Sequence, residues 1–260
     1  RRSSASVKLY TAVAAAVAFL LLVGRDLYLA HLTEPLIPED YHSAPLELFT
    51  LNGVSFYHIK GSFNHKWVST ALNEKLVSAV FEEVTNRACP TGGLIVDVGA
   101  NTGIYGLYSA ARGCRSVMFD PQPQCQRAIL AAMEANGFRE PRVRLMPFAA
   151  TLNKASIKVT NQSQCLTSLS LAPKLNERHS KQLAGAVWYE VPTVRLDEVL
   201  QGPPELPIHL MKVDVEGAEY TVLRSAWRLF EQRRIKALTV EVSPPWWPQF
   251  GVSRTDMATL

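Results

Sequence analysis

Acidic side chains stand at the ends of four short apolar runs in this 260-residue chain. They are Asp97, Asp120, Asp214 and Glu241. Charged groups are costly to bury without partners, so carboxylates at the ends of buried strands indicate a bound ligand. Parallel strands bring their carboxyl ends to one edge of a sheet, where open α/β folds bind their ligands. These acids therefore predict a ligand site at such an edge.

A turn rich in glycine follows the first of these runs, in the sequence LIVDVGANTGIYG of residues 94–106. It joins an apolar run to a helical pattern, as at the entry of a nucleotide-type site. The dinucleotide fingerprint Gly-x-Gly-x-x-Gly requires its second glycine so that the backbone can approach a pyrophosphate. Asn101 occupies that place between Gly99 and Gly103, which disfavours a nicotinamide cofactor. The alternative is an ordinary strand-to-helix turn that uses glycine for its backbone freedom.

Three polar residues are expected to shape ligand binding around this turn. Asp120 ends the second run, about 20 residues beyond the turn, where a carboxylate accepts both hydroxyls of a ribose. Its alternative role is to start an Asp-Pro turn. Asp97 is expected to orient the backbone of the turn and an ammonium group of the ligand. Asn101 is expected to hydrogen-bond in the same region or to adopt a left-handed turn conformation.

A second informative stretch is MKVDVEGAEY, residues 211–220, which crowds Asp214, Glu216 and Glu219 into the end of a strand and the start of a helix. Acids are favoured at a helix N-terminus by about 0.3–1 kcal/mol each, which is one explanation for them. Clustered carboxylates also raise one another's pKa, and a raised pKa suits a general base that removes a hydroxyl proton. We prefer the second explanation, a catalytic site.

Strand-like and helix-like segments alternate along the rest of the chain. Strands are expected at residues 94–98, 116–120, 142–147, 155–161, 187–194, 208–215 and 237–242, and helices at 69–87, 104–112, 124–136 and 220–232. Repeated strand–helix units predict a Rossmann-like, doubly wound α/β fold, whose mostly parallel sheet has helices on both faces. Residues 155–161 and 187–194 are expected to pair antiparallel, and the polar residues 162–182 between them suit a lid or substrate loop.

The N-terminal region carries an apolar, uncharged run at residues 9–24, preceded by Arg1, Arg2 and Lys8. Its length is near the lower limit of about 17 residues for a membrane span. We expect a single-pass anchor over residues 1–32 with its basic end in the cytoplasm. A cleaved signal peptide and a buried helix are the alternatives. A stalk and lead-in over residues 33–65 would then connect it to a domain over residues 66–260, placed in the endoplasmic reticulum or Golgi.

The net charge bears on nucleic-acid binding, and the cysteine content bears on disulfides and metal sites. The formal net charge of +4 is small and the basic residues are scattered, which argues against nucleic-acid binding. The four cysteines, residues 89, 114, 125 and 165, would allow two disulfides, but their spacing fits no disulfide framework and no zinc motif. We expect most of them to be buried free thiols.

The motifs together resemble the FkbM family of methyltransferases, a branch of the class I fold. The resemblance is carried by LIVDVGANTGIYG, FDPQPQC, VPTVRLDEVL and LMKVDVEGAEYTVLRSA. It implies S-adenosylmethionine as cofactor and O-methylation of hydroxyls on sugars, glycolipids or natural products. By position, the cofactor loop is Asp97, Gly99, Asn101 and Gly103, with Asp120 as the ribose ligand where the family usually has Glu, and the acidic block is Asp214, Glu216 and Glu219.

The resemblance also sets expectations for the remaining parts of the chain. Residues 195–197 of the VRLDE segment are expected to support the fold rather than to act in catalysis. Class I folds usually end with two further strands, and little chain follows Val242, so a truncation at Leu260 is expected.

Two mechanisms and two other functions stay open at this point. An acid of the block removes the hydroxyl proton while the sulfonium methyl is attacked in line, or the acids hold Mg²⁺ or Mn²⁺, which acidifies the hydroxyl. We prefer the metal-free mechanism, and the absence of a nearby histidine disfavours zinc. The other functions are a membrane-tethered binding domain without catalysis and a nicotinamide-dependent oxidoreductase.

Overall fold

The computed structural model describes residues 44–60, 74–152, 156–161, 165, 187–202, 206–245 and 247–260. All of these belong to residues 37–260, the second of two units into which the chain divides. The predicted anchor lies outside the described residues, and so does the predicted lid apart from Cys165. Within the described part of the chain, every helix is too short or too polar to cross a bilayer.

A five-stranded parallel sheet forms the centre of the domain, in the order β10-β9-β3-β4-β5. Its strands are β3 (Leu94–Val98), β4 (Arg115–Phe119), β5 (Val143–Met146), β9 (Ile208–Val213) and β10 (Leu238–Val240). The strand order reverses beside β3, because β4 and β9 lie on either side of it. Ligands bind at such a switch point in open α/β sheets. The predicted α/β class with a mostly parallel sheet is confirmed.

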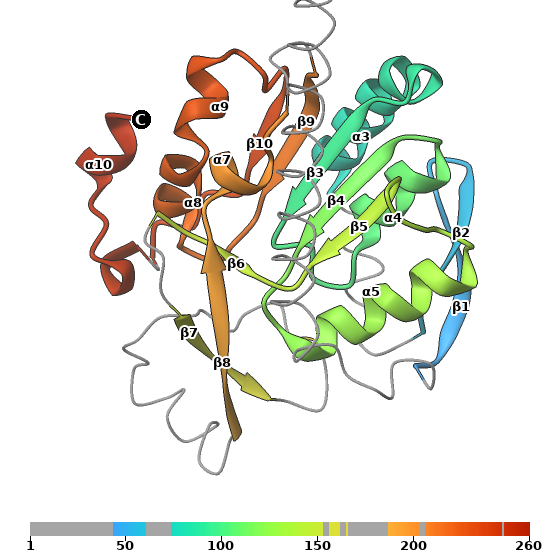
Figure 1. Ribbon diagram of the computed structural model, residues 1–260, viewed down its shortest axis with the longest axis horizontal. Coiled ribbons are helices and arrows are strands. Elements are labelled where there is room, and N and C mark those ends of the chain that lie inside the picture. The colour runs from blue at the N-terminus through green and yellow to red at the C-terminus, as the bar shows by residue number, and fades with distance from the viewer. Residues whose placement is uncertain are drawn as a thin grey trace, which may run out of the picture. The chain divides into compact units, whose positions relative to one another are not determined.

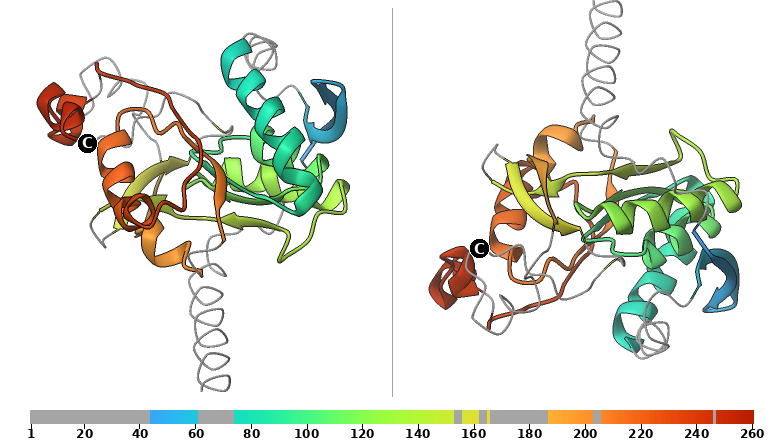
Figure 2. Two further views of the ribbon diagram at one scale, coloured as in Figure 1. Left: turned by 90° about the horizontal axis from the view of Figure 1, so that it is seen from above. Right: turned by 90° about the horizontal axis from the view of Figure 1, so that it is seen from below.

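Helices cover the sheet from two sides (Figures 1 and 2). On one side are α3 (Lys75–Ala88), α4 (Ile104–Ala111) and α5 (Pro123–Ala135), which share a core with the strands. On the other side, α8 (Glu219–Ser225) and α9 (Trp227–Glu231) pack against each other and against the short α7 (Leu196–Val199). The other helical elements in the described part of the chain are η2 (Cys89–Thr91), η3 (Trp247–Phe250) and α10 (Arg254–Ala258).

Local signals explain where most of these helices begin and end. Gly113, at φ +100, follows the end of α4, and Pro123 occupies the first turn of α5, where it removes no helical hydrogen bond. The single helix expected over residues 220–232 is instead two short ones. Ala226 separates α8 from α9 with a backbone that leaves the helical region, at φ −99 and ψ 5.

A hairpin that the sequence analysis did not anticipate precedes this sheet. It pairs β1 (Leu46–Leu51) with β2 (Val54–Ile59), and its turn residues Asn52 and Gly53 both have positive φ. Asn-Gly is a strong signal for such a turn, so the sequence contained the information. The hairpin packs against α4 and α5 and contributes Phe56 to the core.

A small second sheet has the order β6-β8-β7. Its strands are β6 (Ala149–Ala150), β7 (Ser156–Asn161) and β8 (Val187–Val194). β7 and β8 pair antiparallel, which confirms the expected pairing, while β6 runs parallel to β8.

The buried face of α3 differs from its expected one. The apolar residues Leu72, Leu76, Val80 and Val84 recur at four-residue steps, which predicts that they share the buried face of the helix. Leu76 is instead 84% exposed, and Val80 and Val84 are only partly buried. The buried stripe is instead Ser78, Phe81, Thr85 and Ala88. Steps of four residues drift around an α-helix, whereas alternating steps of three and four stay on one face.

The expectation of free thiols is wrong, because all four cysteines are paired. Cys89 of η2 bonds Cys114, directly before β4, and Cys125 of α5 bonds Cys165. The physical reason is topological. The amino ends of β3 and β4 are adjacent, as the hydrogen bond from Arg115 N–H to the Gly93 carbonyl shows, so the segments that carry Cys89 and Cys114 meet.

Replacing both Cys89 and Cys114 by serine is expected to lower the free energy of unfolding by about 2–4 kcal/mol, because the disulfide restricts the unfolded chain. Urea denaturation followed by circular dichroism measures this loss. As a check on the pairing, the unreduced wild-type chain in denaturant should take up no alkylating reagent. Incorporation of four labels would contradict both disulfides.

Candidate active site

The turn between β3 and α4 is held against two neighbouring strands. The N–H groups of Gly99 and Ala100 both donate to the Phe119 carbonyl at the end of β4, each at 2.9 Å. On the other side, a Cβ added to Gly99 would lie 1.8 Å from the Asp214 carbonyl oxygen. Gly99 also has φ +79, in the region that favours glycine. The turn therefore needs glycine for close approach to the end of β9 as well as for its backbone conformation.

Asp120 ties the turn to the end of β4. Its Oδ2 accepts the Asn101 N–H at 2.8 Å, and its Oδ1 accepts the Gln122 N–H at 2.8 Å. The residue is only 2% exposed, and this burial raises its pKa to about 7 against the opposing effect of the two hydrogen bonds. Asn101 adopts a left-handed conformation at φ +55, one of the two roles expected for it.

Asp97 faces the interior of the domain. It is 1% exposed; its Oδ2 accepts the Gly106 N–H in α4 at 3.2 Å, and its Oδ1 lies 3.6 Å from Lys212 Nζ. Burial raises the pKa of Asp97, and the Lys212 ammonium group opposes this shift. The expected support of the loop backbone fits these contacts, since Gly106 lies in the first turn of the helix that follows the loop.

Lys212 is a residue of this site that sequence reasoning missed. It lies directly opposite Asp97 in the pairing of β3 with β9, and its Nζ is 2.8 Å from Asp214 Oδ2. The side chain is 9% exposed, and its ammonium group lies 5.7 Å from the centre of the Tyr105 ring. The signal was the Lys-x-Asp spacing, because residues two apart on a strand share one face.

Three carboxylates gather at the ends of β9 and β10. Oxygens of Asp214, Glu216 and Glu241 all lie within 4.8 Å of one another. A divalent cation could bridge oxygens at this spacing, but acidic side chains at a solvent-facing edge often cluster without one. The sequence expectation that Asp214 and Glu216 lie together is met, and Glu241 joins them.

These carboxylates differ in their affinity for a proton. Burial would raise the pKa of Asp214, but the Lys212 ammonium group and a hydrogen bond with Glu241 bring it below its ordinary value. Burial and the Asp214 charge raise the pKa of Glu216 to about 7. The hydrogen bond with Asp214, followed by burial, raises the pKa of Glu241 to about 8. One fixed anion and two titratable acids therefore stand at the edge of the sheet.

Glu219 is placed apart from this group. It is fully buried at the start of α8, where its two oxygens accept the Gly217 N–H and the Trp247 indole N–H, both at 2.9 Å. Trp247 of η3 is itself buried. These contacts favour a structural role for Glu219 at the start of α8 over a catalytic one.

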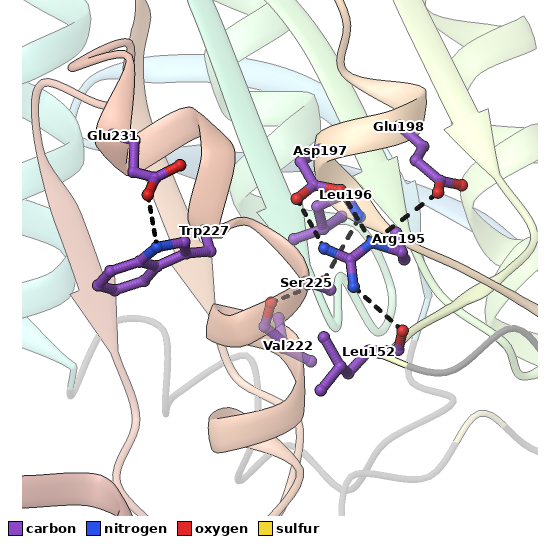
Figure 3. A network of polar contacts seen from close by, with 9 residues as sticks. All are labelled: Leu152, Arg195, Leu196, Asp197, Glu198, Val222, Ser225, Trp227 and Glu231. Carbon is purple, nitrogen blue, oxygen red and sulfur yellow. Dashed lines mark hydrogen bonds and ion pairs between the residues drawn. The ribbon is translucent and has the colours of Figure 1, made fainter. Parts of the chain in front are cut away.

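The VRLDE segment has the supporting role expected of it (Figure 3). The Arg195 guanidinium donates to both oxygens of Asp197, at 3.0 and 2.8 Å, and to the Leu152 carbonyl at 3.2 Å. It thereby joins the start of α7 to the residues that follow β6.

Two further contacts on the turn come from distant parts of the chain. His58 of β2 is buried and its Nε2 lies 3.0 Å from Thr102 Oγ1. Burial lowers the His58 pKa to about 4, so the ring is uncharged at neutral pH. Cys165 Sγ lies 3.3 Å from Asn101 Oδ1, so the Cys125–Cys165 disulfide also packs against the turn.

Comparison with known proteins identifies the family of the chain. Residues 97–259 match the family described as the methyltransferase FkbM domain. The chain belongs to the FkbM methyltransferase family. The methyltransferase sdnD of Sordaria araneosa is 28% identical over 173 residues, which cover 56% of this chain and 67% of the relative. The chain is thus a methyltransferase, and the resemblance read from its motifs is confirmed.

Two solved structures are also similar. The methyltransferase FkbM from Methylobacillus flagellatus is 16% identical, with a TM-score of 0.37 over 57% of this chain and 32% of that one. A SAM-dependent methyltransferase from Agrobacterium tumefaciens is 17% identical, with a TM-score of 0.31 over 39% of this chain and 32% of that one. The chain therefore spans about a third of their length. Both TM-scores are below 0.5, so the α/β fold is assigned from the strand order β10-β9-β3-β4-β5 and not from these two structures.

Replacing Gly99 by alanine is expected to destabilise the domain severely, because the added methyl group would overlap the Asp214 carbonyl oxygen. Gly137→Ala is the matched control, since Gly137 also has positive φ but an added Cβ there meets nothing within 4 Å. The control should cost only the conformational penalty of about 1–2 kcal/mol. Thermal and urea unfolding measure both variants, and equal losses would contradict the close approach.

Proposed function

We propose that this methyltransferase uses S-adenosylmethionine and transfers its methyl group to a hydroxyl oxygen. The observation that carries this proposal is the switch point itself, where the glycine turn, Asp120 and the carboxylates at the ends of β9 and β10 surround one edge of the sheet. The turn would hold the methionine part of the cofactor, with Gly99, Asn101 and Gly103 in contact with it.

Asp120 would hold the ribose of the cofactor. Each carboxylate oxygen already accepts one backbone N–H, at Asn101 and Gln122, and each has a further lone pair for a ribose hydroxyl. The buried position strengthens such hydrogen bonds, because few water molecules compete for them. Asp97 would act on the cofactor through the backbone of the turn, since its own oxygens face Gly106 and Lys212.

Glu216 is the best candidate for the general base. Its pKa of about 7 lies near physiological pH, where a base combines a large deprotonated fraction with useful proton affinity. Asp214 is held anionic beside Lys212 and is therefore a weak base. Its negative charge would stabilise the positively charged sulfonium centre of the cofactor. It would also orient the acceptor hydroxyl for in-line attack on the methyl group. We leave Glu219 out of the catalytic set because both its oxygens bind other groups.

For the acceptor we propose a glycan, a glycolipid or a related metabolite, reached from a membrane-anchored position in the secretory pathway. Two disulfides support an oxidising compartment, since such bonds are rare in the cytosol. The apolar run at residues 9–24 is the basis for the anchor. Methyl transfer from labelled S-adenosylmethionine to a panel of glycans, glycolipids and small hydroxyl compounds tests the acceptor class.

Replacing Asp120 by alanine is expected to weaken S-adenosylmethionine binding by about tenfold or more, because hydrogen bonds to a charged group are lost. Isothermal titration calorimetry measures the dissociation constant. Asp256→Asn, in the exposed helix α10, is the control and should bind like the wild type. Saturable binding of NADH but not of S-adenosylmethionine by the wild type would refute the proposed cofactor.

The rate of methyl transfer is expected to rise with pH through about 7, because Glu216 acts only after it loses its proton. Well below that pH, each unit should lower the rate about tenfold. Glu216→Gln should remove this limb together with most of the activity, as initial rates across a pH series would show. If Glu241→Gln removes the limb instead, the base is Glu241.

A further inference from the structure

Lys212 lies between the side chains of Asp97 and Asp214. It faces Asp97 across the β3–β9 pair, and its Nζ is 3.6 Å from Asp97 Oδ1 and 2.8 Å from Asp214 Oδ2. Two other groups face it from the helical side. Tyr105 of α4 presents its ring to the ammonium group and donates its hydroxyl to Glu74, just before α3, at 2.6 Å.

The two anions beside Lys212 differ in their access to water. The side chain of Asp97 is 1% exposed, whereas that of Asp214 is 27% exposed. Without the ammonium group, Asp214 can be hydrated, whereas Asp97 would lose the Lys212 cation that opposes the effect of burial on its charged form. A buried charge that loses its partner is strongly destabilising, and its surroundings rearrange to reach solvent or a proton.

A rearrangement at Asp97 would reach the cofactor turn directly. The second oxygen of Asp97 holds the Gly106 N–H in the first turn of α4, immediately beyond the turn that ends at Gly103. Asp214 is joined to the other end of the same turn, because its N–H donates to the Val98 carbonyl at 3.0 Å. Lys212 thus contacts the side chains of two residues that fix the position of the turn.

We propose that Lys212 is a positioning residue of the cofactor site. Its ammonium group holds Asp97 and Asp214 in one arrangement, and the affinity for S-adenosylmethionine depends on that arrangement. The inference rests on the proposed function. It assigns to Lys212 no contact with the cofactor and no proton transfer.

A double-mutant cycle on the full chain tests this role, with S-adenosylmethionine binding measured by calorimetry. Lys212→Met keeps the length of the side chain and removes its charge, and it should weaken binding about tenfold or more. Asp97→Asn combined with Lys212→Met removes both charges of this buried pair, so the double variant should bind more tightly than Lys212→Met alone. A packing role of the lysine stem would not be rescued by a change at Asp97.

The control is Lys236→Met, at an exposed lysine that bonds the Arg233 carbonyl, and it should bind like the wild type. If Lys212→Met does not fold, the double variant is expected to fold and to bind S-adenosylmethionine, and its failure to do so overturns the inference. Wild-type affinity in Lys212→Met, or independent effects of the two substitutions, also overturns it. A wild type that binds no S-adenosylmethionine refutes the proposed function and this inference together.

Discussion

The site depends on one close contact, between the turn after β3 and the backbone at the end of β9. A single methyl group on Gly99 would reach within 1.8 Å of the Asp214 carbonyl oxygen, and the Asp214 N–H is already bonded to Val98. Protein interiors are packed too densely to absorb such an intrusion locally. The separation between the glycine turn and the acidic group is therefore set by the backbone, before any side chain contributes.

Charge balance around this contact gives each carboxylate a different character. Lys212 neutralises the two acids that lie nearest to it, and the more exposed acids compete for protons instead. Burial and the nearby Asp214 charge raise the pKa of Glu216, and a hydrogen bond with Asp214 together with burial raises that of Glu241, so both acids take up protons near neutral pH. The edge of the sheet therefore avoids carrying its full negative charge and still retains a permanent anion at Asp214.

Most of the parts predicted correctly from sequence have local signals. The strand of residues 94–98 is a short apolar run ended by glycine, and the helix after it ends at Gly113, so both follow from neighbouring residues. Cysteine pairing and the ion pair of Lys212 with Asp97 could not be derived in this way, because their partners are far apart in the sequence. The role of Glu219 was decided by Trp247, which is 28 residues away.

The β1–β2 hairpin packs into the folded domain but lies outside the residues that match the family. The family match begins at residue 97, inside β3, whereas the hairpin ends at Ile59. Yet the hairpin places His58 against the turn after β3, and the Asn136 side chain at the end of α5 bonds both the N–H and the carbonyl of Tyr57. A protein trimmed to the matched residues would expose the apolar surface of α4 and α5 and lose a brace on the turn. We therefore expect the smallest stably folded form of this domain to include the hairpin from Leu46 onward.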